Sequence, residues 1–118
     1  MNGWNFIVTG ASRGLGLELA RGLARRGARV VGVARGPEIE AAMAGIREEG
    51  GEAWGVVADV GDPDAAARIA GEAAALIGPI DGLVQNAGTL GATPLRPWLD
   101  GPAEALEEAL REIGRAHV

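Results

Sequence analysis

The sequence predicts an α/β fold, with a parallel β-sheet covered by helices on both faces. Short apolar runs rich in valine and isoleucine alternate four times with amphipathic segments of helical length. Glycine or proline separates most of these segments from the next. The strand runs are continuously apolar, which is typical of strands that are buried on both faces. The length of 118 residues is that of one domain.

The first predicted unit begins with an apolar run at residues 6–9 that leads into a glycine-rich turn. The helix expected after it covers residues 14–26. Within it a leucine recurs every fourth residue from Leu15 to Leu23, which predicts one apolar face. Gly27 is expected to end this helix.

The second predicted unit begins with a strand at residues 30–33. Pro37 suits the first position of the following helix, and Gly50 is expected to end it. The residues at helical spacing that are expected to face the sheet are Ile39, Met43 and Ile46.

The third predicted unit has its strand at residues 53–57 and its helix from Asp62 to about Gly78. Aspartate is a good helix cap, and Pro63 after it suits the first helical position. The side chains of this helix that are expected to face inward are Ile69, Ala73, Leu76 and Ile77.

The fourth predicted unit has a short strand at residues 82–85, a loop at 88–101 and a helix that begins at Pro102. The inner stripe of that last helix is expected to hold Leu106, Leu110 and Ile113. The whole chain, residues 1–118, is thus expected to be a single partial domain. It would be the N-terminal half, about four βα units, of a three-layer, Rossmann-type, doubly wound parallel sheet. The outer edge of the fourth strand would be left open.

Composition excludes several kinds of chemistry. The chain contains 11 arginines but no lysine, no tyrosine and no cysteine, and Ser12 is its only serine. Without cysteine there is no disulfide framework and no thiolate site, and the lone His117 cannot build a histidine-rich metal site. The net charge of −5 argues against a nucleic-acid partner. No targeting or membrane-spanning segment is visible, so a cytoplasmic protein is expected.

The most informative segment is the glycine-rich turn between the first strand and the first helix. A nucleotide pyrophosphate binds well there, because free backbone N–H groups and the positive end of the helix dipole point toward it. Gly10 would permit the tight turn, Gly14 would leave space for a phosphate, and Gly16 would let the helix lie close to the sheet. Ser12 and Arg13 lie between them. A plain glycine-rich connection without a ligand remains the alternative for this segment alone.

Two weaker signals follow the third and fourth strands. Asp59, next to Val60, could accept a hydrogen bond from an adenine amino group, although it could equally be an ordinary loop aspartate. Asn86 is followed by Ala87 and Gly88, a combination that could bridge two backbone segments and leave room for a ligand, or could be a simple turn. All these signals lie at the carboxyl ends of strands, where open α/β sheets bind ligands.

Together these motifs resemble the short-chain dehydrogenase/reductase family. The segment from Thr9 to Gly16 is similar to the Thr-Gly-x3-Gly-x-Gly cofactor motif, and the segment 86–88 to the Asn-Asn-Ala-Gly motif, with Gln85 at its first position. The resemblance implies hydride transfer between NAD(P)H and a carbonyl or alcohol. It also implies that the glycines and Leu15 contact the pyrophosphate. Asp59 and Val60 would hold the adenine, and residues 86–88 would flank its ribose.

NADP is expected rather than NAD. An acidic residue at the end of the second strand would bond the ribose 2′-hydroxyl and repel a 2′-phosphate, but this chain has Ala34 there. Arg35 follows it, and Arg13 lies in the glycine-rich turn. Two guanidinium groups match the charge and geometry of a phosphate. The alternative is that both arginines are solvated loop residues.

The catalytic residues that the resemblance implies, serine, tyrosine, lysine and a further asparagine, match no position of this chain. We therefore interpret it as the truncated, cofactor-binding N-terminal half of a longer enzyme. This half is expected to bind cofactor at most and to be inactive alone. The complete protein is expected to be a homo-oligomer. Two alternatives remain, a non-catalytic dinucleotide-binding sensor and an interaction module that uses the last helix. The substrate cannot be inferred from these residues.

Overall fold

A computed structural model describes residues 2–62, 64–86 and 97–99. Its centre is one five-stranded sheet in the order β3-β2-β1-β4-β5. The strands are β1 (Asn5–Thr9), β2 (Arg29–Ala34), β3 (Glu52–Val57), β4 (Gly82–Val84) and β5 (Pro97–Leu99). The first four are parallel to one another, whereas β5 runs antiparallel to β4.

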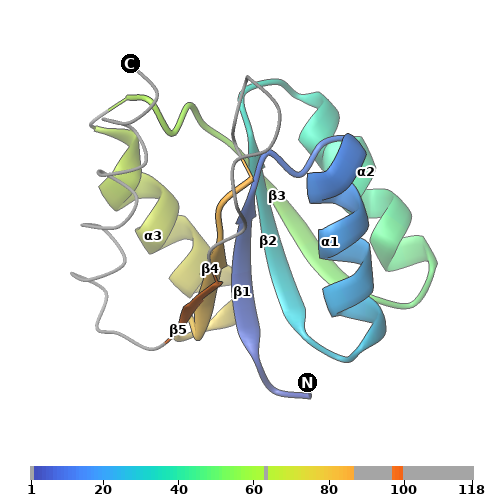
Figure 1. The fold of residues 1–118 in the computed structure, drawn as a ribbon. Coiled ribbons are helices and arrows are strands. Elements are labelled where there is room, and N and C mark those ends of the chain that lie inside the picture. Colours follow the sequence, from blue (N-terminus) through green and yellow to red (C-terminus); the bar gives the residue numbers. More distant parts are fainter. Residues whose placement is uncertain (1, 63, 87–96, 100–118) are drawn as a thin grey trace.

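Helices cover both faces of this sheet, which makes three layers (Figure 1). Helices α1 (Gly14–Arg25) and α2 (Glu38–Glu48) lie on one face, and α3 (Ala65–Ile77) lies on the other. The predicted Rossmann-type doubly wound arrangement is thus confirmed. Among the described residues, no helix is both long and apolar enough to cross a membrane.

Each face of the sheet has its own apolar core. Under α1 and α2, the sheet residues Phe6, Val8 and Val30 pack against buried residues of those helices. Under α3, Ile7, Val31 and Leu83 pack against Ile69 and Ile77, among others. Neighbouring residues of β1 therefore point to opposite cores, which explains why the strand is apolar at the three consecutive positions 6–8 rather than at every second one. The predicted inner stripe of α2 is confirmed, since Ile39, Met43 and Ile46 are all buried.

The buried face of α1 differs from the predicted leucine stripe. Its fully buried residues are Gly16, Ala20 and Ala24. Leu19 and Leu23 are only partly buried at the margin of the core, and Leu15 is 58% exposed. Small residues on the inner face let the helix axis approach the sheet, and the leucines then fill the space beside it.

One inward position predicted for α3 is wrong. Leu76 is 44% exposed, whereas Ile69, Ala73 and Ile77 are buried as expected. The helix also begins at Ala65 rather than at residue 62 or 63. Asp62 still supports its start, because its Oδ1 accepts the backbone N–H of Asp64 at 2.9 Å.

The prediction of an open edge beside β4 is also wrong. β5, which lies inside the predicted loop at 88–101, pairs with β4, and Val84 stands opposite Pro97. Proline is tolerated in an outermost strand because no ladder hydrogen bond is needed on its free side. Such a short run with a proline carries no strand signal of its own. The helix predicted from Pro102 lies outside the described residues.

The amino-terminal edge of the sheet is tied by polar contacts between β1 and the turn before β4. The backbone N–H of Asn5 donates to Asp81 Oδ2 at 2.8 Å, and the N–H of Asp81 donates to the Asn5 carbonyl at 2.8 Å. The buried side chain of Asn5 also donates from Nδ2 to the carbonyl of Pro79 at 2.7 Å. These bonds align β4 with β1 and so position the segment that follows β4 at the opposite edge.

The last turn of α3 offers a matched test of this packing. We expect Ile77→Ala to lower the free energy of unfolding of the complete protein by about 2–4 kcal/mol, because it leaves a cavity in a dense core. Leu76→Ala should cost less than about 1 kcal/mol, because that side chain is half exposed. Urea unfolding measures both. Equal losses would show that Leu76 is as buried as the sequence pattern had indicated.

Candidate functional site

The carboxyl ends of the four parallel strands meet at one edge of the sheet, near the top in Figure 1. Each strand leads there into a segment that carries predicted site residues. The glycine-rich turn follows β1, Arg35 follows β2, Asp59 lies after β3 and Asn86 lies after β4. From β1 the chain first adds β2 and β3 on one side, and then crosses over to add β4 on the other side. The strand order therefore reverses between β1 and β4. Ligands of open α/β sheets bind at such a point.

Backbone hydrogen bonds join the first three of these segments. The N–H of Gly10 donates to the Val33 carbonyl at 2.8 Å, which fixes the glycine-rich turn to the end of β2. The N–H of Ala58 donates to the Ala34 carbonyl at 2.9 Å, which fixes the end of β3 to that of β2. The arrangement is therefore held by the backbone itself.

The glycines of the turn differ in their roles. Gly10 has φ of 64° and Gly14 has φ of 61°, in the left-handed region that other residues adopt only at an energetic cost. A Cβ added at Gly14 would meet nothing within 4 Å, so the space beside it is open. Both observations agree with the predicted tight turn at Gly10 and the predicted space at Gly14.

Gly16 is needed for close packing rather than for its backbone angles. A Cβ added there would collide with the carbonyl oxygen of Gly10 and would lie 2.6 Å from Asn86 Nδ2. The first turn of α1, the end of β1 and the segment after β4 therefore meet at this point. Asn86 is half-buried there, and its own N–H donates to Thr9 Oγ1 at 3.0 Å.

The amino-terminal end of α1 presents a row of unused donors. In the part of the chain that the structure describes, no protein acceptor bonds the backbone N–H groups from Ser12 to Gly16. Arg13 occupies the cap position, yet its side chain makes no capping hydrogen bond. The helix dipole adds partial positive charge at the same end. These features suit a bound anion such as a phosphate.

The residues around this row are accessible. Arg13 and Arg35 are exposed, and neither forms an ion pair with a carboxylate within the described ranges. Leu15 is an exposed apolar side chain in the first turn of α1. The half-buried Ala34, at the end of β2, brings no negative charge to this region. The site therefore combines free donors, free cations and one apolar contact surface.

Asp59 and Val60 form the turn after β3. Asp59 is exposed, and its Oδ1 accepts the N–H of Gly61 at 2.8 Å, which holds the carboxylate in a defined direction. Its second oxygen has no protein donor among the described residues. Val60 is half-buried against the core under α3 and could form an apolar wall.

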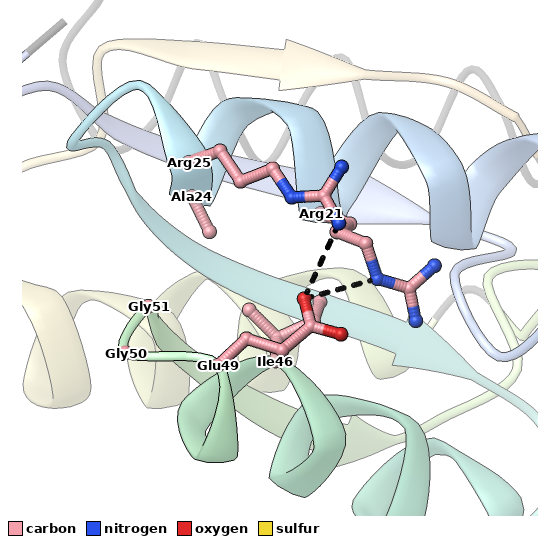
Figure 2. A pocket seen from close by; sticks show the side chains of 7 residues that line it. All are labelled: Arg21, Ala24, Arg25, Ile46, Glu49, Gly50 and Gly51. Atoms are coloured by element: carbon pink, nitrogen blue, oxygen red, sulfur yellow. Dashed lines mark ion pairs between the residues drawn. The ribbon is translucent and has the colours of Figure 1, made fainter.

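A separate hollow of about 200 Å³ lies between α1 and the end of α2 (Figure 2). Arg21 and Arg25 reach from α1 toward Glu49, whose Oε1 lies 3.3 Å from Arg21 Nε and 3.7 Å from Arg25 Nη2. The charged side chains that line this hollow already pair with one another. Arg25 also belongs to the last turn of α1. The hollow therefore lies away from the amino-terminal donors of that helix and is no part of the candidate site.

Comparison with known proteins agrees with this geometry. Residues 5–111 match the family described as short chain dehydrogenase. The chain belongs to that family. The resemblance that the sequence motifs indicated is thus confirmed.

Relatives of this chain include the gluconate 5-dehydrogenase of Gluconobacter oxydans, which is 45% identical over 99 residues. The L-rhamnose 1-dehydrogenase (NAD(P)(+)) of Azotobacter vinelandii is 43% identical over 103 residues. Each alignment covers 83% of this chain and 39% of the relative. The chain thus spans about two fifths of the length of the relatives that it matches.

Solved structures of the same family share the fold. An actinorhodin polyketide ketoreductase variant with NADPH matches with a TM-score of 0.71 and 37% identity, over 77% of this chain and 35% of that one. A metagenomic short-chain oxidoreductase in complex with NADP matches with a TM-score of 0.70 and 43% identity, over 75% of this chain and 40% of that one. Both of those proteins hold a cofactor with a 2′-phosphate.

In the sequence analysis Thr9 is named only as the first residue of the glycine motif and has no role of its own. It is completely buried, and its hydroxyl oxygen accepts the N–H of Asn86. The available signal was a hydroxyl residue at the end of an otherwise apolar strand, directly before the turn. Of the predicted site residues, Ala87 and Gly88 lie outside the described residues.

Two glycines of α1 provide a matched test of the close contact. Gly16→Ala should lower the free energy of unfolding by about 1–3 kcal/mol, because the new methyl group must displace backbone or Asn86. Gly22→Ala lies in the same helix with nothing within 4 Å of the added Cβ. It should raise the free energy by about 0.5–1 kcal/mol through helix propensity. Thermal unfolding of the complete protein compares them, and a neutral Gly16→Ala would contradict the close contact.

Proposed function

We propose that this chain is the cofactor-binding part of a short-chain oxidoreductase that transfers hydride between NADP(H) and a carbonyl or alcohol. The observation that carries the proposal is the row of free N–H groups at the start of α1, beside an open Gly14 and two free arginines. The hydride chemistry itself is supplied by the nicotinamide when it is bound. The described residues contribute binding and orientation.

The pyrophosphate is expected at the amino-terminal end of α1. The free N–H groups there can bond phosphate oxygens, and the exposed Leu15 can cover the apolar side of the cofactor. Ser12 can add a hydroxyl donor from within the turn. Gly10 and Gly16 are expected to act indirectly, because they shape the turn and its distance from the sheet.

The adenosine half is expected across the ends of β2, β3 and β4. The free oxygen of Asp59 would accept from the adenine amino group, and Val60 would pack against the ring. Asn86, anchored through Thr9, would flank the ribose. Ala87 and Gly88 are proposed for the same ribose contact.

The 2′-phosphate is the basis of the proposed preference for NADP over NAD. Arg35 and Arg13 flank the end of β2 and the glycine-rich turn, and both are free to bind an anion. Ala34 offers no carboxylate for the 2′-hydroxyl of NAD. The NADP and NADPH bound in two similar structures support the same choice.

Proton transfer would require residues that this chain lacks. It contains no tyrosine and no lysine, and its single serine lies in the cofactor turn. We propose that the chain alone is inactive and that the complete protein supplies these groups.

The same absence favours a second candidate, a non-catalytic dinucleotide sensor. The reading frame beyond Val118 separates the two, since a serine followed by Tyr-x3-Lys supports the enzyme and their absence supports the sensor.

The arginine beside β2 provides the test of cofactor choice. In the complete protein, Arg35→Ala should weaken NADP binding about 10- to 100-fold and leave NAD binding nearly unchanged, because a charge-assisted contact is lost. Isothermal titration calorimetry with both cofactors measures this. Calorimetry is preferred to tryptophan fluorescence. Trp4, which directly precedes β1, stacks on Phe6 at the edge of the sheet opposite to the site.

Arg26→Ala is the matched control, because Arg26 is also exposed but follows the far end of α1. It should change neither affinity beyond the general effect of one lost charge. An unchanged ratio of NADP to NAD affinity in Arg35→Ala would refute the proposed role. So would tighter binding of NAD than of NADP by the parent protein.

A further inference from the structure

β3 forms one outer edge of the sheet, since the strand order places only β2 beside it. The N–H of Ala58, just after β3, donates to Ala34 on β2. Backbone groups of successive residues in a strand point alternately to its two sides. The carbonyls of Ala53, Gly55 and Val57 therefore point away from β2, toward the free edge.

Two of these three outward carbonyls are bonded by arginine side chains. Arg47, in the last turn of α2, donates from Nη1 to the Ala53 carbonyl at 2.6 Å. Arg68, on α3, donates from Nη2 to the Val57 carbonyl at 3.1 Å. Helices α2 and α3 lie on opposite faces of the sheet (Figure 1). The two arginines therefore bond the same strand edge from both sides.

Arg68 is held in place by a second contact. Its Nη1 lies 3.4 Å from Glu72 Oε1, one turn further along α3. The side chains of Arg68 and Glu72 are 50% and 46% exposed, so this pair contributes little to stability. Its structural effect is to direct the other nitrogen of the guanidinium toward the strand.

We propose that Arg47 and Arg68 close the β3 edge against pairing with β3 of a second copy of this chain. Unpaired edges of sheets are templates for strand addition. The segment Ala53–Val57 is uncharged, and two of its five residues are valines, so an identical strand would fit its edge well. The bonded carbonyls are four residues, or about 13 Å, apart, so a strand that pairs along the edge must displace both arginines.

Charge strengthens this protection. A second copy would bring its own Arg47 and Arg68 to the same seam, so four guanidinium groups would lie between the two sheets. Burying the two Arg47 charges, which have no carboxylate partner among the described residues, is unfavourable. The remaining outward carbonyl, that of Gly55, lies between the two arginines and offers too short a site for stable pairing. This proposal is independent of cofactor binding.

The test compares the complete parent protein with Arg47→Ala/Arg68→Ala. Sedimentation velocity should show an additional, concentration-dependent association of the parent's own oligomeric form, at least about tenfold tighter than the same step in the parent, because charge-assisted bonds that blocked the edge are gone. Hydrogen exchange with mass spectrometry should show slower exchange in the peptide that covers Glu52–Val57. Association through another surface would leave that peptide unprotected.

Arg25→Ala/Arg26→Ala is the matched control, because it removes the same charge from the end of α1 and should not cause association. Circular dichroism shows whether each variant folds. If the double variant unfolds, Arg68→Ala alone decides by the same two measurements, since its half-exposed side chain is not part of either core. A folded variant with the parent's association and the parent's exchange in β3 overturns the proposal.

Discussion

The contact between Gly16 and the Gly10 carbonyl is the constraint on which the rest of the site depends. Only a glycine at this position lets the first turn of α1 lie against the end of β1 and against Asn86. The N–H groups of that turn then project beside the ends of β2 and β4. A side chain at position 16 would move the helix outward and separate the donors from the other binding segments.

The same region is stabilised from two directions. Thr9, which is buried, binds the segment after β4 through its hydroxyl group, and the Val33 carbonyl binds the turn at Gly10. At the opposite edge of the sheet, Asn5 and Asp81 align β4 with β1. Because both ends of these neighbouring strands are tied, the candidate site has a rigid base and needs few contacts of its own.

The two sides of the parallel part of the described sheet, at β3 and at β4, are covered differently. β4 is covered by the antiparallel β5, which satisfies its backbone groups with another strand. β3 keeps an outer edge, and two arginines bond its carbonyls instead. Both arrangements reduce the tendency of an exposed strand to pair with another molecule. The two cores on either side of the sheet remain independent of these edges.

The sequence alone determined the order of elements from β1 to β4, the three-layer class and the family, because those depend on local periodicity and on short motifs. It also placed the predicted site residues after the carboxyl ends of those strands. It placed Gly10, Gly14 and Gly16 in distinct roles that the geometry of the turn supports. Tertiary structure decided what depends on distant partners. The burial of Leu15 and Leu76 was mispredicted, since helical spacing does not say how wide the covered face is. The anchoring role of Thr9, the pairing of β5 with β4 and the arginine bonds at β3 each join residues far apart in the chain. No local pattern records such contacts.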